Sequence, residues 1–453
     1  MAQRLRAGLA CLLALLLCAC GGGADEPRPP ADVPRQAPLA RPASCGQTDL
    51  RAWLHAQMQD QYFWSSQMPA PDAWAASTDA YFRSMLHLPL DRYSYTQPAA
   101  AFDQFYREGT RTGYGYTVVW ADAAQTQLRV RHVEPHSPAA AAGLRRGDLV
   151  LAIDGQPPQA VAQGLPAVTT PGVPRRFSVL GVDGTHREFT VLSATFSLAS
   201  VASQRVLQVA SQAGAPRVVG YFAYHEFIVP SETHLDAVFR EFIAAGVNEL
   251  VLDLRYNGGG DVMMARGLAS MIGGKRVDRE VFAEFRYNSR NAAANFKLPL
   301  TANIGLLPGP PLEGLRRVVV ITSAETASAS ELLINALRPF MPVVLVGQTT
   351  YGKPYGFQPR TECGTSFNPV AFETLNALGE GRFVDGFAPW CEAADSLDHA
   401  LGDPDEASLA AALHYLRFDA CPAPAARQPQ SARLGPRAAG ALGDTVPAGM
   451  WLH

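Results

Sequence analysis

Three short apolar runs constrain the fold of this chain more than any other feature. They are residues 249–254 (ELVLDL), 316–321 (RRVVVI) and 342–347 (PVVLVG). Each run is continuous rather than alternating, which is typical of strands buried on both faces of a parallel sheet. We therefore expect three buried strands in the second half of the chain.

Helical patterns lie between and before these runs. Residues 234–246 place apolar side chains at helical spacing and end at a glycine, and a second helix is expected from about Ser328 to Arg338. Strands that alternate with helices predict right-handed parallel crossovers. The region from about residue 193 to 421 is therefore predicted to be an α/β core.

The loops that follow the three runs carry the candidate chemistry, because parallel sheets bind ligands beyond the carboxyl ends of their strands. The loops are residues 255–261 (RYNGGGD), 322–330 (TSAETASAS) and 348–358 (QTTYGKPYGFQ). If the strands are neighbours, these loops meet. Each loop offers one group that acyl transfer needs, although each alone is also common in structural roles.

The second loop brings a serine to a helix N-terminus, where the helix dipole favours negative charge. Ser323, Ser328 and Ser330 are all candidates at this point. The third loop brings Lys353, which can act as a general base if burial lowers its pKa. The glycines of the first loop can expose backbone N–H groups to an oxyanion.

Residues 101–192 have a different pattern. A strand, a short helix N-capped by Ser137 and a second strand precede a hairpin signal at Asp183-Gly184. This order resembles a PDZ domain, and its carboxylate-binding loop then falls on Gly113, Tyr114, Gly115 and Tyr116. The resemblance implies that the following strand edge takes a peptide as an added strand. The alternative is a small β-domain whose glycines only make turns.

The first residues read as an export signal. A short apolar run follows Arg4 and Arg6 and ends at Cys20, which resembles the acylated cysteine of a bacterial lipoprotein. Gly21 after that cysteine implies the outer membrane, and the lipid anchor makes the membrane a partner. The alternative is an ordinary secretory signal. Net charge is −3 without a long basic run, so nucleic acid is not expected as a partner.

Four cysteines remain after the signal, an even number that suits disulfides in an oxidising compartment. They are Cys45, Cys363, Cys391 and Cys421. Three pairings are possible, and we favour Cys363–Cys391 with Cys45–Cys421; free thiols are the alternative. No metal site and no cofactor are expected, because no C-x-x-C or paired-histidine spacing is present.

The motifs LVLDLRYNGGG, ETASASELL and GQTTYGK resemble the carboxy-terminal processing, or tail-specific, serine protease family, over residues 193–420 with the PDZ-like region in front. The resemblance implies a ClpP/crotonase-like core. The family's 25-residue serine-to-lysine spacing selects Ser328 as nucleophile and Lys353 as base. The oxyanion donors carried over are the backbone N–H groups of Gly259 and Ala329.

Two positions depart from the family pattern. Gly258 stands where proline is frequent. The glutamine that usually follows the lysine by four residues and helps to position it is replaced by Phe357, and Gln358 comes one residue later. Either the loop bulges by one residue, so that Gln358 joins the catalytic group, or Gln358 does not have that role.

The predicted function is a periplasmic serine endopeptidase that recognises protein or peptide substrates with accessible C-termini. One alternative pairs Ser328 with His225 and a carboxylate, Glu226 or Glu331. Another is a catalytically silent, lipid-anchored PDZ scaffold. The apolar residues 449–453 (GMWLH) could occupy the chain's own PDZ groove. The predicted domains are a signal peptide (1–20), a Pro-rich linker (21–44), a helical domain (45–100), a PDZ domain (101–192), a protease core (193–421) and a disordered tail (422–453).

Overall fold

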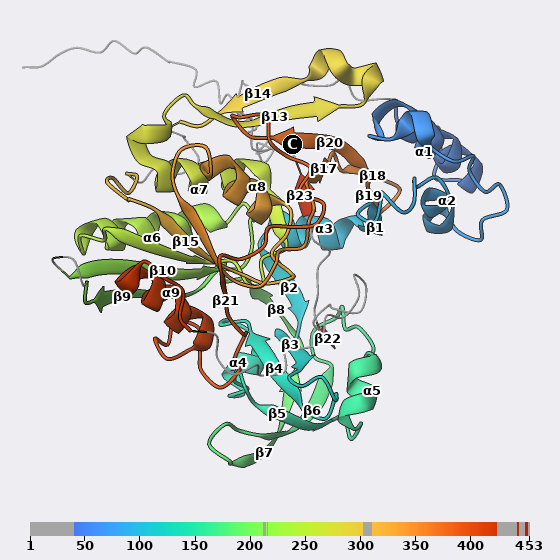
Figure 1. Ribbon diagram of the computed structural model, residues 1–453. Helices are drawn as coiled ribbons and strands as arrows, with labels where there is room; N and C mark the ends of the chain where they lie inside the picture. The colour runs from blue at the N-terminus through green and yellow to red at the C-terminus, as the bar shows by residue number, and fades with distance from the viewer. Residues whose placement is uncertain are drawn as a thin grey trace, which may run out of the picture.

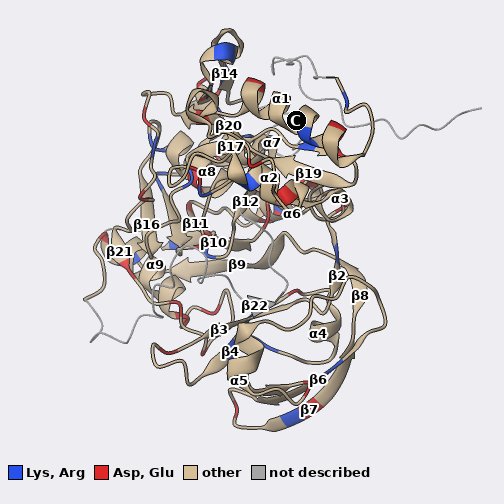
Figure 2. Cartoon of the chain, turned by 90° about the vertical axis from the view of Figure 1, so that its right-hand side faces the viewer, with Lys and Arg blue, Asp and Glu red and all other residues tan. Residues whose placement is uncertain are grey.

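The computed structural model describes residues 40–211, 214, 216–301, 310–423, 442–443 and 449–451. The predicted signal peptide, Cys20 and most of the predicted linker and tail therefore lie outside the described residues. Within the described part, no helix is long and apolar enough to cross a membrane. Positive and negative side chains are interspersed along the elements in Figure 2 rather than gathered on one of them.

A six-stranded sheet forms the centre of the core, in the order β21-β16-β15-β11-β10-β9 (Figure 1). The three predicted strands are confirmed as neighbours, and they pair in parallel with β10 on one side and β21 on the other. Only β9 runs antiparallel. The bounds are β9 Val201–Val209, β10 Arg217–Tyr224, β11 Glu249–Asp253, β15 Val318–Thr322, β16 Val343–Gly347 and β21 Cys391–Glu392.

Helices cover both faces of this sheet, because its strands are apolar on both sides. Leu250, Leu252 and Val320 pack into the cluster that also holds the apolar faces of three helices, α6 (Ser231–Ala244), α7 (Val262–Gly273) and α8 (Ala329–Leu337). Val251 and Val319 point the other way, into the cluster under α9 (Ala407–Phe418). The two predicted helices are confirmed as α6 and α8.

A second six-stranded sheet lies against α7 and α8, in the order β12-β23-β17-β20-β13-β14. Its residues Phe285, Phe372 and Met450 lie in the same large cluster as α7 and α8. The bounds are β12 Gly259–Asp261, β13 Val281–Tyr287, β14 Phe296–Pro299, β17 Tyr355–Phe357, β20 Val370–Leu375 and β23 Gly449–Trp451, with 3-10 turns η2 (Gly274–Val277) and η3 (Ser289–Ala294). Two of its strands, β12 and β17, flank β23.

The region expected to be a PDZ domain contains the sheet β22-β3-β4-β5-β6-β7 and its own apolar cluster. Ser137 caps α4 (Pro138–Ala141) and the hairpin at Asp183-Gly184 joins β6 to β7, both as predicted. The remaining bounds are β2 Thr110–Gly113, β3 Tyr116–Trp120, β4 Leu128–Val133, β5 Leu149–Ile153, α5 Pro158–Gln163, β6 Pro174–Leu180, β7 His186–Leu192, β8 Ala194–Ser197 and β22 Leu442–Gly443. β2 pairs with β8.

The first described helices share a core with residues much later in the chain. Trp53, Phe82 and Tyr95 cluster with Phe357 and Phe367. The bounds are α1 Gln47–Gln61, η1 Ser65–Gln67, α2 Thr78–Ser84, β1 Tyr95–Pro98, α3 Ala99–Tyr106, β18 Arg360–Glu362 and β19 Thr365–Asn368, with β1 paired to β19. The helices are therefore anchored on the second half of the chain.

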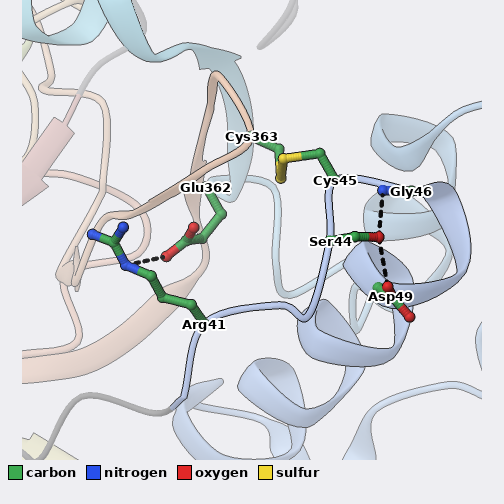
Figure 3. The surroundings of a disulfide bond; sticks show 7 residues. All are labelled: Arg41, Ser44, Cys45, Gly46, Asp49, Glu362 and Cys363. Carbon is green, nitrogen blue, oxygen red and sulfur yellow. Dashed lines mark hydrogen bonds and ion pairs between the residues drawn. A yellow bond between two sulfur atoms is a disulfide. The ribbon is translucent and has the colours of Figure 1, made fainter.

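The disulfides connect different cysteines from those predicted. Cys45 bonds Cys363, and Cys391 bonds Cys421, with Cα–Cα distances of 5.5 and 5.3 Å. The pairing of Cys363 with Cys391 was therefore wrong. The β1–β19 pairing brings the β18–β19 turn, which carries Cys363, beside the start of α1, where an ion pair between Arg41 and Glu362 accompanies the bond (Figure 3).

The predicted disordered tail is also corrected in part. Leu442–Gly443 and Gly449–Trp451 each form a strand, β22 and β23. Their composition did not predict order, since both depend on strands from elsewhere in the chain for every backbone pairing.

Candidate active site

Ser328 lies where the sequence places it, between β15 and α8, as the N-cap of the helix. Its backbone has φ 62° and ψ −113°, a conformation that costs a non-glycine residue about 1–3 kcal/mol. The sequence predicted a serine at a helix start but not this backbone conformation. The side chain is fully buried, and its Oγ has no hydrogen-bond partner among the described residues.

Glu331 fixes the backbone on both sides of the site. One carboxylate oxygen accepts hydrogen bonds from the N–H of Ser328 at 2.9 Å and from the N–H of Lys353 at 2.8 Å. The other accepts from the hydroxyl of Thr350 and the N–H of Gly352 at 2.6 and 2.7 Å. Burial raises the pKa of Glu331, and these four donors oppose that rise. A single buried carboxylate therefore joins the serine loop to the lysine loop.

Replacing Glu331 by glutamine is expected to damage both stability and catalysis. The amide nitrogen of glutamine must then face a backbone or hydroxyl donor, which leaves buried polar groups unpaired. We expect the free energy of unfolding to fall by about 2–3 kcal/mol. We expect kcat/KM to fall on the order of 10²-fold, because displacement of either loop misplaces its reacting group.

Chemical denaturation and peptidase assays check this expectation. Glu188→Gln is the matched control, since Glu188 is 45% exposed and pairs only at the surface with Arg176. Equal stability and activity of Glu331→Gln and Glu188→Gln would contradict the bracing role.

Lys353 is buried, and burial lowers the pKa of its amine well below the ordinary value, against the opposing effect of Asp91 and Glu331. A neutral amine is a competent general base. Its Nζ lies 3.7 Å from the ring centre of Phe357 and 5.9 Å from that of Tyr93. Because Ser328 Oγ has no hydrogen-bond partner among the residues that the structure describes, Ser328 and Lys353 are not hydrogen-bonded to each other in this state.

Gln358 does not join the catalytic group. Its Nε2 donates to the hydroxyl of Tyr287 at 3.4 Å, and its Oε1 has no partner among the described residues. The sequence left open a one-residue bulge in the loop after Lys353. The extra residue lies instead in β20, the strand paired with β17, since Gly356 pairs with Phe372 but Phe357 pairs with Val370. Phe357, not Gln358, therefore contacts Lys353. The prediction that Gln358 belongs to the catalytic group with Ser328 and Lys353 is corrected.

The first loop is folded back on itself. The N–H of Gly259 donates to Oδ1 of Asn257 at 2.8 Å, while the amide of Asn257 donates to the carbonyl of Tyr224 at 2.9 Å. The N–H of Ala329 lies in the first turn of α8, where backbone donors lack an intrahelical acceptor. Of the two predicted oxyanion donors, Gly259 is thus engaged by a side chain.

The other two serines of the second loop have structural partners. Ser330 donates to the carbonyl of Asn257 at 3.0 Å, and Ser323 donates to the carbonyl of Arg255. Both bonds fix the first loop against the second. Neither hydroxyl is available as a nucleophile in this arrangement.

A buried ionic network beneath the first loop was missed by sequence reasoning. The Arg255 guanidinium, 1% exposed, binds Asp253 at 2.7 Å, Glu406 at 2.7 Å and Asp395 at 3.2 Å. Arg146 of the PDZ-like region also reaches Asp395, at 2.8 Å. The sequence shows only Asp253 beside Arg255, because the partners Asp395 and Glu406 are 140 and 151 residues away in the chain.

A second ion pair from the PDZ-like region reaches the loop that carries the nucleophile. Arg131 binds Glu325 at 2.6 Å and lies 4.5 Å from the ring centre of Tyr256. Glu325 is three residues before Ser328, and Tyr256 precedes Asn257. The PDZ-like region is therefore in direct contact with two of the three loops.

His225 is not placed as the base of Ser328. Its ring contacts His132 and Tyr256, at centroid distances of 4.4 and 5.8 Å, and burial lowers its pKa well below the ordinary value. Glu331, one carboxylate considered for this triad, is bound to the two loops instead. The histidine alternative therefore has no geometric support here.

His132, Glu134 and His225 have ligand atoms within 4.8 Å of one another, as a metal site would need. His132 and Glu134 are hydrogen-bonded to each other at 3.1 Å. Arg131 and the neighbouring arginines Arg146 and Arg255 also act on His225. This positive surrounding disfavours an added cation, and we assign no metal to the cluster.

The predicted peptide-binding loop precedes the strand β3, which lies next to the end strand β22 of its sheet. Tyr114 and Tyr116 are buried, with 1% and 4% exposure, and Gly115 has φ 80°. The carbonyl of Gly115 accepts a hydrogen bond from the N–H of Glu134. A Cβ at Gly115 would lie 2.1 Å from Ser137, so only glycine fits between this loop and α4.

Two segments of the chain match known protein families. Residues 218–365 match peptidase family S41. Residues 129–164 match a PDZ domain. These segments contain Ser328, Lys353 and Glu331 in one case and most of β4 through α5 in the other. The fold is therefore an S41 protease fold of mixed α/β content with a PDZ domain.

Curated relatives align over part of their length. The chain is 26% identical over 259 residues to a chloroplastic C-terminal processing peptidase of Tetradesmus obliquus, covering 54% of this chain and 52% of that protein. It is 29% identical over 231 residues to a carboxyl-terminal-processing protease of Synechocystis, covering 50% and 49%. The chain spans about half the length of the curated relatives it matches.

A solved structure shares the fold over most of the chain. It is an S41 protease from Bacteroides fragilis, with a TM-score of 0.65 and 24% identity, covering 84% of this chain and 99% of that one. At this identity the likeness concerns the fold.

Proposed function

We propose that the protein is a serine endopeptidase in which Ser328 is the nucleophile and Lys353 the general base. One observation carries the proposal: a single oxygen of buried Glu331 holds the backbones of both residues, and burial lowers the lysine pKa. A base with a lowered pKa beside a strained serine is the arrangement that acyl transfer needs.

The reaction follows from these groups. Neutral Lys353 accepts the proton of Ser328 Oγ as the oxygen attacks a peptide carbonyl. The N–H groups of Gly259 and Ala329 stabilise the oxyanion, for which the Gly259 N–H must leave Asn257 Oδ1. Protonated Lys353 then donates its proton to the departing amine. Water, deprotonated by Lys353, releases the acyl group and restores the serine.

Engagement of the dyad requires a change from the described state. Within the described part of the chain Ser328 Oγ has no hydrogen-bond partner, and Lys353 packs on Phe357, so a side-chain rotation must bring the two together. The hydrogen bonds of an active site often align only when substrate binds. The described arrangement therefore represents a resting state in this proposal.

The substrates we propose are envelope proteins recognised through accessible C-terminal segments. The support is the PDZ match, the position of β3 behind the loop Gly113–Tyr116, and the processing activity that the relatives' names state. A peptide would add to β3 as a strand in place of the two-residue strand β22.

The location we propose is the periplasm, with the chain anchored by lipid on Cys20, in the outer membrane. The support is the signal-like sequence that ends at Cys20, the disulfides, and relatives from cyanobacteria and a chloroplast. Radiolabelled palmitate is expected to enter the native protein and not the Cys20→Ala variant expressed in the same bacterium. Equal labelling of both would contradict the anchor.

The domain limits we propose are residues 45–100, 101–192 and 193–421, with a ClpP/crotonase-like core in the last. The separate apolar cluster of residues 114–191 and the parallel crossovers around β11, β15 and β16 support these limits. The N-terminal helices share their cluster with the core, which makes the first limit the least sharp.

An active-site probe tests the proposed function. A fluorophosphonate forms a covalent adduct with an activated serine, and intact and peptide-level mass spectrometry locate it. We expect one adduct on Ser328 together with cleavage of β-casein, an unstructured protein substrate. No adduct on Ser328 and no cleavage would instead favour the silent PDZ scaffold.

A further inference from the structure

The strand β23 separates two parts of the proposed active site. On one side it pairs with β12, where Gly449 lies opposite Gly259 and Met450 opposite Gly260. On the other side Trp451 pairs with Phe357. β23 therefore lies between β12, which carries an oxyanion donor, and β17, which follows Lys353; Figure 1 shows β23 beside β17.

The space that β23 fills has the width of one strand. Because neighbouring strands lie about 4.8 Å apart, β12 and β17 are separated by about 10 Å across β23. No direct pairing of β12 with β17 exists among the described residues. Removing β23 would thus leave two facing rows of backbone donors and acceptors, which an extended peptide satisfies.

Met450 anchors the segment. Its side chain is fully buried in the main cluster of the core, together with residues of α7 and α8. Ser328 and Lys353 are also buried, at 0% and 1% exposure. A substrate carbonyl cannot reach Ser328 Oγ until something that covers the site moves.

A neighbouring segment of the same chain covers the PDZ edge. Leu442 pairs with Val118 and Gly443 with Thr117 on β3, which makes β22 the end strand of that sheet. Six residue steps separate Gly443 from Gly449, at most about 20 Å of extended chain. The expectation that residues 449–453 fill the PDZ groove is therefore corrected: residues 442–443 pair with the PDZ strand, and residues 449–451 lie in the protease core.

We propose that the space between β12 and β17 is the site where an extended substrate segment binds as an added strand, and that Gly449–Trp451 occupies this site in cis. The segment must leave before a substrate reaches Ser328. Because Met450 is the buried anchor, the same position of a substrate takes an apolar side chain. This inference rests on the proposed function, since it names the substrate site of that activity.

The test compares three full-length proteins: native, Met450→Asp and Leu378→Asp. An aspartate at position 450 would be buried without a partner, which expels the strand. Leu378 is 69% exposed and belongs to none of the strands β12, β17 and β23. Leu378→Asp is therefore the matched control, because it also replaces an apolar side chain by aspartate. We expect Met450→Asp to raise β-casein cleavage and fluorophosphonate labelling about tenfold or more, and Leu378→Asp to behave as native.

A peptide supplied in trans gives a second readout. The synthetic peptide VPAGMWLH, which is residues 446–453, is expected to return Met450→Asp to the native rate. The same peptide with aspartate in place of methionine is expected to have no effect. Fluorescein-labelled VPAGMWLH should bind Met450→Asp and not the native chain, whose site is filled.

The outcomes separate this inference from the proposed function. Native labelling of Ser328 with no change in folded Met450→Asp, and no effect of the peptide, would overturn the inference alone. If neither the native protein nor Met450→Asp forms an adduct on Ser328, the proposed function is overturned. Binding of labelled VPAGMWLH to Met450→Asp but not to the native protein would then support the inference, and no difference in binding would overturn it.

If Met450→Asp does not fold, a measurement on the native protein still tests the inference. Amide exchange of residues 449–451 is expected to be slow and to become faster when saturating β-casein is added. Protection that is unchanged by casein would overturn the inference.

Discussion

Replacing Ser328 by alanine is expected to lower kcat/KM for β-casein on the order of 10⁶-fold, as removal of a nucleophile does in other serine peptidases. The hydroxyl has no hydrogen-bond partner among the described residues, so we expect its loss to remove no structural bond. The free energy of unfolding should therefore stay close to native. Peptidase assays with the purified variant and a thermal unfolding curve measure the two quantities.

Ser330→Ala is the discriminating control, because it makes the same change two residues away. Ser330 donates to the carbonyl of Asn257, and losing this bond should cost about 1 kcal/mol of stability. The fluorophosphonate adduct should remain on Ser328 in this variant. Loss of the adduct from Ser330→Ala but not from Ser328→Ala would reverse the assignment of the nucleophile.

The parallel core could be predicted because its signals are local. Continuous apolar runs define β11, β15 and β16, and the crossover rule makes them neighbours in the order observed. The loops that follow them then meet without further information. Ser328 and Lys353 were brought to one place by that topology alone.

The role of Glu331 at the start of α8 could have been predicted from the sequence, but it was not among our predictions. Ser328 and Glu331 have the S-x-x-E spacing of a capping box, in which the glutamate side chain accepts from the N-cap N–H. What the spacing does not reveal is that the same carboxylate also accepts from Lys353 and Gly352. Those bonds depend on where the third loop lies.

Disulfide connectivity, the place of Gln358 and the strand β23 could not be predicted, for a common reason. Each depends on pairing between segments far apart in the chain: β1 with β19, β17 with β20, and β12 with β23. A shift of one residue in such a pairing moves a side chain to the other face of the sheet. Gln358 is the clearest case, because the shift lies in β20, fourteen residues away from Phe357.

Replacing Lys353 by methionine is expected to lower kcat/KM by about 10³-fold, within the usual contribution of a general base. Methionine has a similar length but cannot accept a proton. Burial already disfavours the charged amine, so the apolar side chain should leave the free energy of unfolding unchanged or raise it. A loss of activity without a loss of stability separates a catalytic role from a structural one.

The dependence of kcat/KM on pH tests whether Lys353 acts as a neutral base. Lys353 must be neutral to act, and its lowered pKa makes the native kcat/KM rise with pH through a value well below the roughly 10.4 of a free lysine. Lys353→Met should lose that rise. Lys297→Met is the matched control, since Lys297 is 65% exposed on β14 and should keep both the rate and the profile. A Lys353→Met enzyme that retains a native rise with pH would show that another group takes the proton of Ser328.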